Sequence, residues 1–130
     1  IKKVGQDVTL VTWGKIFHKA LKASEEADKL DISVEIIDIR TISPLDEEVI
    51  FTSVRKTNRC LIVEENWPFS SVGSHISDRI QLKCFDDLDA PIEKIAQAPV
   101  PVPYCESLEN LALPSVTNIL EAIKRVSYYK

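Results

Sequence analysis

The three cysteines are the residues with the widest chemical range, because a thiolate can act as a nucleophile, a redox group or a metal ligand. Cys60, Cys84 and Cys105 are separated by 24 and 21 residues, which matches neither a close-spaced zinc-ligand pair nor a redox pair. We therefore interpret them as three reduced thiols of a cytosol or matrix. Cys60 runs directly into the apolar segment 61–63, which is typical of a strand interior.

Two histidines and two adjacent glutamates are the other candidates for catalysis. His18 and His75 fall in segments of helical periodicity, where a helix-surface or interface position is favoured over a catalytic base. Glu64 and Glu65 directly follow an apolar run. An acid there could orient a substrate, but it could equally be solvated or cap a loop.

The three glycines exclude phosphate-binding loops. Gly5, Gly14 and Gly73 stand far apart, so neither a dinucleotide-binding fingerprint nor a Walker loop can be written from this chain. No nucleophile elbow or serine, histidine and aspartate grouping is present either. The sequence thus predicts no catalytic, cofactor-binding or metal-binding residue in residues 1–130.

The elements that would position any site alternate regularly. β-rich runs begin near residues 8, 33, 59 and 91, and segments of helical periodicity follow at 16–30, 44–56, 72–84 and 116–126. Strands separated by helices require crossover connections. The pattern therefore predicts an α/β fold with three layers: a mostly parallel sheet of four or five strands and helices on both faces.

Two local patterns predict how the chain enters and leaves these elements. Ser43, Pro44 and Asp46 have the types of a cap, a first-turn proline and a first-turn acid, which predicts a helix start at Ser43. The segment 98–113 holds three prolines, which predicts an extended surface connection with room for one short extra strand.

Composition and charge limit the class of protein. Of 130 residues, 45% are hydrophobic and 28% are charged, which is typical of one globular domain. The formal charge of −4 argues against nucleic acid as a partner, and no apolar stretch is long enough to predict a membrane span. Because the chain has no methionine, even at position 1, we expect it to be a piece of a longer protein.

Two features suggest contact with partners. Trp67, Pro68 and Phe69 follow the third strand run, where two large rings would pack either beneath a neighbouring loop or against a partner. Segment 86–109 carries six acidic residues against Lys94 alone, which favours steering of a basic partner, although such a cluster can also be only a solvated face.

Four segments resemble one known family in order and spacing. They are DIRTISPLDEEVI at 38–50, KTNRCLIVEENWPFSSVG at 56–73, LDAPIEKI at 88–95 and VPVPYCESLE at 100–109. Together they are similar to the C-terminal domain of the β subunit of the thiamine-dependent decarboxylating component of pyruvate dehydrogenase, within the transketolase C-terminal-like family. The resemblance covers nearly the whole chain, and it implies a mostly parallel α/β domain.

The resemblance also implies a role. The parent enzyme would decarboxylate pyruvate and reductively acetylate lipoyl groups, in the mitochondrial matrix or the bacterial cytoplasm. Its thiamine diphosphate and magnesium would lie between the α subunit and the N-terminal domain of the β subunit, so the domain seen here would itself be inactive. It would pair with a second β subunit and dock the subunit-binding domain of the dihydrolipoyl acetyltransferase.

The family implies site residues for both contacts. Asp89, in the LDAP motif, would contact the basic subunit-binding domain, with Asp86 and Asp87 steering it and the chain terminus at Lys130 in the same patch. Trp67, Pro68 and Phe69 would lie near the subunit interface.

Two other interpretations are compatible with the sequence. The β subunit of a branched-chain 2-oxo acid dehydrogenase would share the fold and role, but the loop at Asn66 to Pro68 resembles the pyruvate type more. A free-standing flavodoxin-like module would instead bind a small ligand at its strand ends, and the sequence offers it no phosphate loop.

Overall fold

The computed structural model describes residues 1–129, which form one four-stranded sheet. Its strands are β1 (Val8–Thr12), β2 (Val34–Asp38), β3 (Cys60–Val63) and β4 (Glu93–Ile95). They lie in the order β2-β1-β3-β4, and every neighbouring pair is parallel. The loops that follow the strands therefore meet at one end of the sheet, and those that precede them meet at the other.

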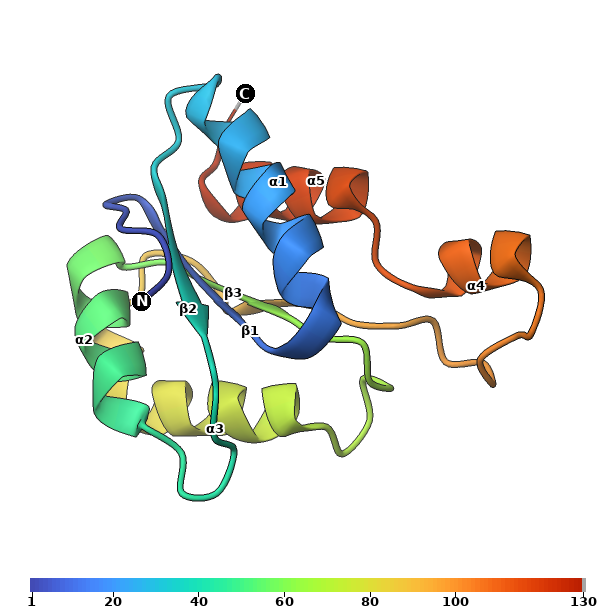
Figure 1. The fold of residues 1–130 in the computed structure, drawn as a ribbon. Helices are drawn as coiled ribbons and strands as arrows, with labels where there is room; N and C mark the ends of the chain where they lie inside the picture. The colour runs from blue at the N-terminus through green and yellow to red at the C-terminus, as the bar shows by residue number, and fades with distance from the viewer. Residues whose placement is uncertain (130) are drawn as a thin grey trace.

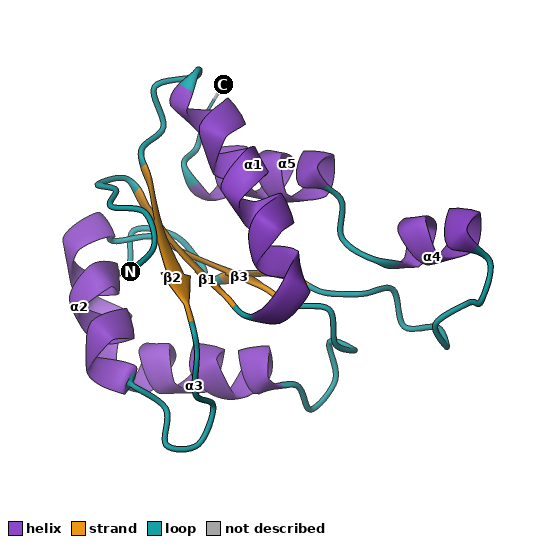
Figure 2. Ribbon diagram, viewed as in Figure 1, coloured by secondary structure: helices purple, strands orange, loops and turns teal. Residues whose placement is uncertain are grey.

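Helices cover both faces of this sheet (Figures 1 and 2). One layer consists of α1 (Phe17–Asp28) and α5 (Val116–Val126), and the other of α2 (Glu47–Thr57) and α3 (Val72–Cys84). The short helices η1 (Gly14–Ile16) and η2 (Phe85–Asp87) precede α1 and follow α3. The predicted three-layer α/β fold is confirmed.

The alternation of side chains along β1 explains the two cores. Val8 and Leu10 point into the core beneath α1 and α5, while Val11 points into the core beneath α2 and α3. All five residues of β1 are buried, as expected for a strand with helices on both faces. No helix among residues 1–129 has the length and apolarity needed to cross a membrane.

Two predictions about local structure were wrong. The segment after β4 is not extended throughout, because α4 (Glu106–Ala112) forms within it after the last of its three prolines. Helix α2 begins later than expected: Ser43 and Pro44 lie in a turn, and Asp46 is the N-cap, accepting a hydrogen bond from the Val49 N–H at 3.4 Å. The cap lies three residues later because an aspartate accepts this bond as well as a serine does.

Candidate functional site

Glu64 is fully buried where β3 ends, and its partners are the N-cap Ser71 and the first-turn residue Gly73 of α3. Its carboxylate accepts a hydrogen bond from the Ser71 hydroxyl at 2.5 Å and from the Gly73 N–H at 3.2 Å. A carboxylate at a helix N-terminus satisfies free N–H groups and complements the helix dipole. Of the two roles considered for Glu64, the geometry supports capping rather than contact with a substrate.

The loop after Glu64 holds its aromatic residues at the surface. Trp67 is 49% exposed and donates from Nε1 to the carbonyl of Val100 at 3.1 Å, while Phe69 is 85% exposed. The carbonyl of Pro68 accepts from Ser74 Oγ at 3.1 Å. Phe69 is therefore largely exposed to solvent, whereas Trp67 is half exposed and held to the neighbouring segment by its hydrogen bond to Val100.

Lys94 also holds this loop, in addition to the bonds that Val100 and Ser74 make with it. From the edge strand β4 its Nζ donates to the Pro68 carbonyl at 2.9 Å and to Ser74 Oγ at 2.5 Å. The loop conformation is therefore fixed from two elements, β4 and α3, and its exposed rings are presented on a defined backbone.

The chain from residue 98 to residue 113, which we call the arm, extends the apolar surface of the Trp67 loop. Figure 1 shows α4 projecting away from the sheet and its helical layers. Exposed apolar side chains gather here: Val100, Val102, Tyr104, Leu108 and Leu111. A cleft of about 430 Å³ runs between the arm and the end of β4, with Pro68 in its lining. Exposed apolar surface of this extent is typical of an interaction site.

The three predicted docking aspartates lie at the opposite end of the sheet. Asp86 and Asp87 are in η2, and Asp89 follows in the loop that leads into β4. The backbone N–H of Asp89 donates to the carbonyl of Asn58 at 2.8 Å, while its side chain is exposed and makes no hydrogen bond within residues 1–129. Asp87 lies 3.6 Å from Arg55 Nε, so part of its charge is already compensated.

A hollow of about 520 Å³ lies beside Asp89. Its lining also includes Phe85, Leu88, Ala90 and Pro91, so an apolar surface borders the exposed carboxylate. Phe85 is 65% exposed. The surface can thus offer both a charge contact and an apolar contact to a partner. Lys130, which was grouped with this patch, lies outside the described residues.

The six acidic residues of segment 86–109 do not form one patch. Glu106 and Glu109 lie on α4, beyond the carboxyl end of β4, whereas the three aspartates precede that strand. Glu93 is paired with Arg125 of α5. The local charge at the docking aspartates is therefore smaller than the sequence count indicates.

The cysteines and histidines occupy the predicted kinds of position. Cys60 and Cys84 are buried free thiols, and burial raises the pKa of Cys60 to about 12. Cys105 is exposed, and hydrogen bonds from the Ser107 hydroxyl and nearby backbone N–H groups lower its thiol pKa. His18 and His75 are exposed on α1 and α3. Within residues 1–129, no three histidine, cysteine or acidic side chains are grouped so that they could hold a metal ion.

One ion pair between a buried acid and a partly exposed lysine was missed by the sequence reasoning. Glu35, the second residue of β2, is buried and hydrogen-bonded to Lys56 of α2 and to the Gly5 N–H. Burial raises the pKa of this carboxyl, but the hydrogen bonds from Lys56, Ser53 and Gly5 outweigh it, so that the pKa lies below the ordinary value of 4.5. The sequence feature that could have indicated this pair is a single glutamate among the apolar residues of β2.

The sheet order and the helix layers together define a parallel α/β domain with helices on both faces of the sheet. The profile of the transketolase C-terminal domain matches residues 1–119, and the chain belongs to that family. This membership replaces the flavodoxin-like interpretation.

The relatives are whole β subunits of one enzyme component. The chain is 46% identical over 129 residues to the pyruvate dehydrogenase E1 component subunit beta of Rickettsia conorii, covering 99% of this chain and 40% of the relative. It is 48% identical to that of Rhizobium meliloti, covering 98% and 28%, and 44% identical to the mitochondrial subunit of Dictyostelium discoideum, covering 98% and 36%. The chain thus spans less than half the length of these relatives.

A solved structure agrees on the fold. A split-gene transketolase, described as an inactive beta4 tetramer, superposes with a TM-score of 0.83 over 98% of this chain and 40% of the other, at 23% identity. At that identity the match shows that the two chains share a fold, and it identifies no site.

Proposed function

We propose that this chain is the C-terminal domain of the β subunit of a pyruvate dehydrogenase decarboxylating component, and that it pairs subunits and docks the acetyltransferase. The observation that carries this proposal is the 42–48% identity to such subunits over almost the whole chain. The parent reaction would be decarboxylation of pyruvate and acetylation of lipoyl groups. Its thiamine diphosphate and magnesium would be held elsewhere in the parent, since residues 1–129 supply no group of three metal ligands.

Subunit pairing would use the Trp67 loop together with the arm. Trp67, Phe69 and the apolar side chains of the arm are exposed on neighbouring segments, and the Trp67 to Val100 hydrogen bond joins the two. A symmetric pair of subunits buries the same patch on each copy, so a continuous apolar surface suits this role. The α subunit would be a further partner of the parent.

Docking of the acetyltransferase would use Asp86, Asp87 and Asp89. The exposed Asp89 carboxylate would pair with a cation of the basic subunit-binding domain, and the hollow beside it would take an apolar side chain. Lys130 is proposed for the same contact on the basis of the family alone.

A chimaera tests the assignment directly. Residues 1–130 would replace the corresponding portion of the Rhizobium meliloti β subunit, and the product would be co-expressed with that organism's α subunit. We expect a stable assembly that binds the subunit-binding domain and acetylates lipoyl groups from pyruvate. A folded chimaera that pairs neither with its own copy nor with the α subunit would contradict the proposal.

A further inference from the structure

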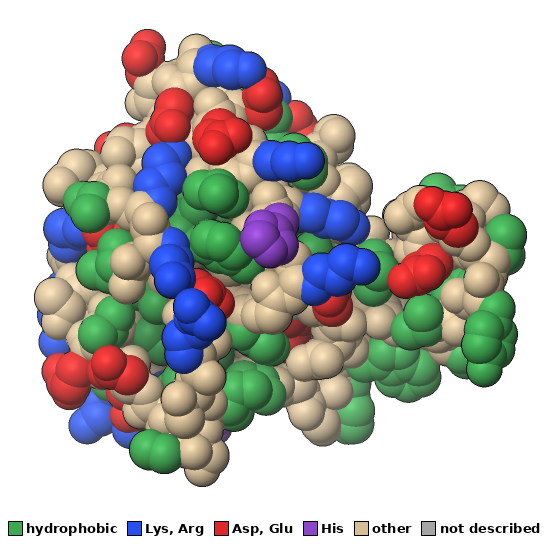
Figure 3. Space-filling model, viewed as in Figure 1, with side chains coloured by type: hydrophobic (Ala, Val, Ile, Leu, Met, Phe, Trp, Pro, Cys, Tyr) green, Lys and Arg blue, Asp and Glu red, His purple; other side chains and the backbone are tan. Residues whose placement is uncertain are grey.

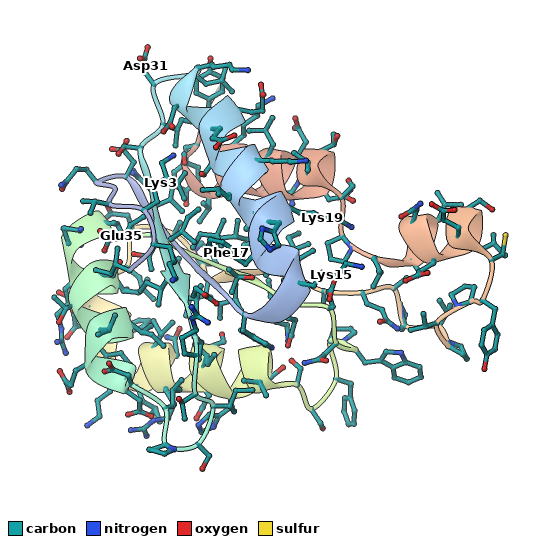
Figure 4. The ribbon with its side chains drawn as sticks, viewed as in Figure 1. Lys3, Lys15, Phe17, Lys19, Asp31 and Glu35 are labelled. Carbon is teal, nitrogen blue, oxygen red and sulfur yellow. The ribbon has the colours of Figure 1, made fainter. Side chains whose placement is uncertain are left out.

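A face rich in lysine lies on the exposed side of η1 and α1. Lys15, Lys19 and Lys22 follow one another at helical spacing, and the sequence contains no acidic residue between Asp7 and Glu25. Figure 3 shows cationic side chains in two rows on this side of the molecule, with apolar side chains and a histidine between them. Figure 4 shows Lys15 in η1, and Phe17 and Lys19 in the first turn of α1. In a chain of net charge −4, this local excess of positive charge is distinctive.

The second row comes from the first residues of the chain and from the end of β2. Lys2 is fixed in position by its backbone N–H, which donates to the Ile36 carbonyl at 2.8 Å. Lys3 is paired with Asp28 at 2.7 Å, and Arg40 is paired with Asp38 at 3.1 Å. By contrast Lys2, Lys15 and Lys22 have no ion-pair partner among residues 1–129.

A hollow of about 420 Å³ lies between the rows. It is lined by Lys2, Gly14, Phe17, His18, Asp38, Ile39 and Arg40. The rings of Phe17 and His18 contact each other edge to face, 5.4 Å between centroids. Phe17 and Leu21 are only partly buried, so the floor between the lysines is apolar.

The spacing of the cations favours an extended ligand over a small anion. Lys15, in η1, and Lys22, in α1, are seven residues apart in the sequence, so spaced carboxylates can each contact a separate lysine. Lys19 donates to the carbonyl of Pro114 at 2.9 Å, and Arg40 is already paired, so neither is free to close around a compact anion. An extended chain with spaced carboxylates matches this arrangement.

We propose that this α1 lysine face, made of Lys2, Lys15, Phe17, His18 and Lys22, docks an acidic segment of a partner protein. The carboxylates would lie along the lysines, and an apolar side chain would enter the hollow beside Phe17. The proposal goes beyond the proposed function and uses none of its residues.

A titration followed by NMR tests it. A short synthetic peptide that alternates glutamate and leucine would be added to the ¹⁵N-labelled chain. We expect saturable shifts confined to residues 2–3, 14–22 and 38–40, with affinity falling as salt is raised. Lys22→Glu should weaken the binding by about fivefold or more, because it reverses one contacting charge. Lys83→Glu on α3 makes the same change in net charge elsewhere and should leave the affinity unchanged.

Five results would overturn the proposal. Four of them are the absence of saturable shifts, shifts centred on another surface, equal weakening by Lys83→Glu, and equal affinity for free glutamate or inorganic phosphate. A duplex DNA that binds this face more tightly than the peptide would also overturn it, since it would identify a nucleic-acid site. Circular dichroism of each variant confirms that its fold is intact.

Discussion

Gly73 and Glu64 fit together so closely that neither can change independently. The Gly73 N–H donates to Glu64 Oε2 at 3.2 Å, and a Cβ atom at residue 73 would lie 2.6 Å from Oε1 of the same carboxylate. The glycine is required here by the approach of a buried acid. Its contact joins the end of β3 to the start of α3, on either side of the Trp67 loop.

Replacement of the buried carboxylate should destabilise the fold. Glu64→Gln loses a charge-assisted acceptor for Ser71 and Gly73, so we expect the free energy of unfolding to fall by about 2 kcal/mol. Glu65→Gln, at the neighbouring and more accessible position, should change it little. Urea denaturation of both variants measures the difference. Equal stability of the two would show that Glu64 is not a cap.

The Glu35 to Lys56 pair should make stability depend on acid pH. Because the folded-state pKa of Glu35 lies below 4.5, its contribution to stability is full above that value and is lost as pH falls through the folded pKa. Lys56→Met should lower the free energy of unfolding by about 1–2 kcal/mol near neutral pH. This is less than for a fully buried pair, because the lysine is partly exposed to solvent. The difference in stability between Lys56→Met and the wild-type chain should become smaller below pH 4.5. Thermal unfolding over a pH series tests this, and a pH-independent difference would contradict it.

Cysteine reactivity should separate the three thiols. Cys105 is exposed and its thiol pKa is lowered by Ser107, whereas Cys60 is buried with a pKa of about 12. We expect iodoacetamide to alkylate Cys105 first, and Ser107→Ala to slow that reaction. Mass spectrometry of the alkylated peptides over time gives the rates. Alkylation of Cys60 at a similar rate would show that the core opens readily.

Trp67→Ala should weaken subunit pairing if the Trp67 loop is the interface. A half-exposed tryptophan held by a hydrogen bond is a typical interface anchor. Its truncation should weaken the free energy of dimerisation by about 2 kcal/mol or more. Phe85→Ala removes an exposed ring at the other end of the sheet and serves as the control. Sedimentation over a concentration series measures both. A wild-type chain that stays monomeric at high concentration would count against the pairing role.

Asp89→Asn should act mainly on dissociation of the acetyltransferase. If its carboxylate contacts a partner cation in a desolvated site, we expect the binding free energy to weaken by roughly 2 kcal/mol. Neutralising Asp86 and Asp87 should instead lower the association rate and its salt dependence. Surface plasmon resonance of the intact β-subunit assembly against the subunit-binding domain separates these effects. Asp78→Asn on α3 is the matched control, and unchanged affinity for Asp89→Asn would remove that residue from the site.

Periodicity predicted the four strands and four of the helices, because burial on both faces leaves continuous apolar runs such as the one at 61–63. It missed α4, whose sequence follows three prolines and whose apolar side chains are mostly exposed. A helix without a buried face has a weak sequence pattern. The start of α2 was misplaced because two capping residues, Ser43 and Asp46, lie close together.

The candidate sites were harder to predict than the fold. The exposure of Trp67 and the pairing of Glu35 with Lys56 depend on which segments meet in space, and local sequence does not carry that information. The acidic segment 86–109 was misleading for the same reason, since β4 places its residues at opposite ends of the sheet. Asp89 came from family resemblance, and no pattern of spacing would have selected it.

The attachment of the arm has a consequence for local unfolding. Few backbone hydrogen bonds hold its ends, among them Ala98 to the Ala112 carbonyl at 2.8 Å, and most of its apolar side chains lie outside both cores. Opening the arm therefore costs only a small part of the global free energy of unfolding. Its amide hydrogens should exchange with deuterium long before those of β1, and a protease should cut it while the sheet stays folded.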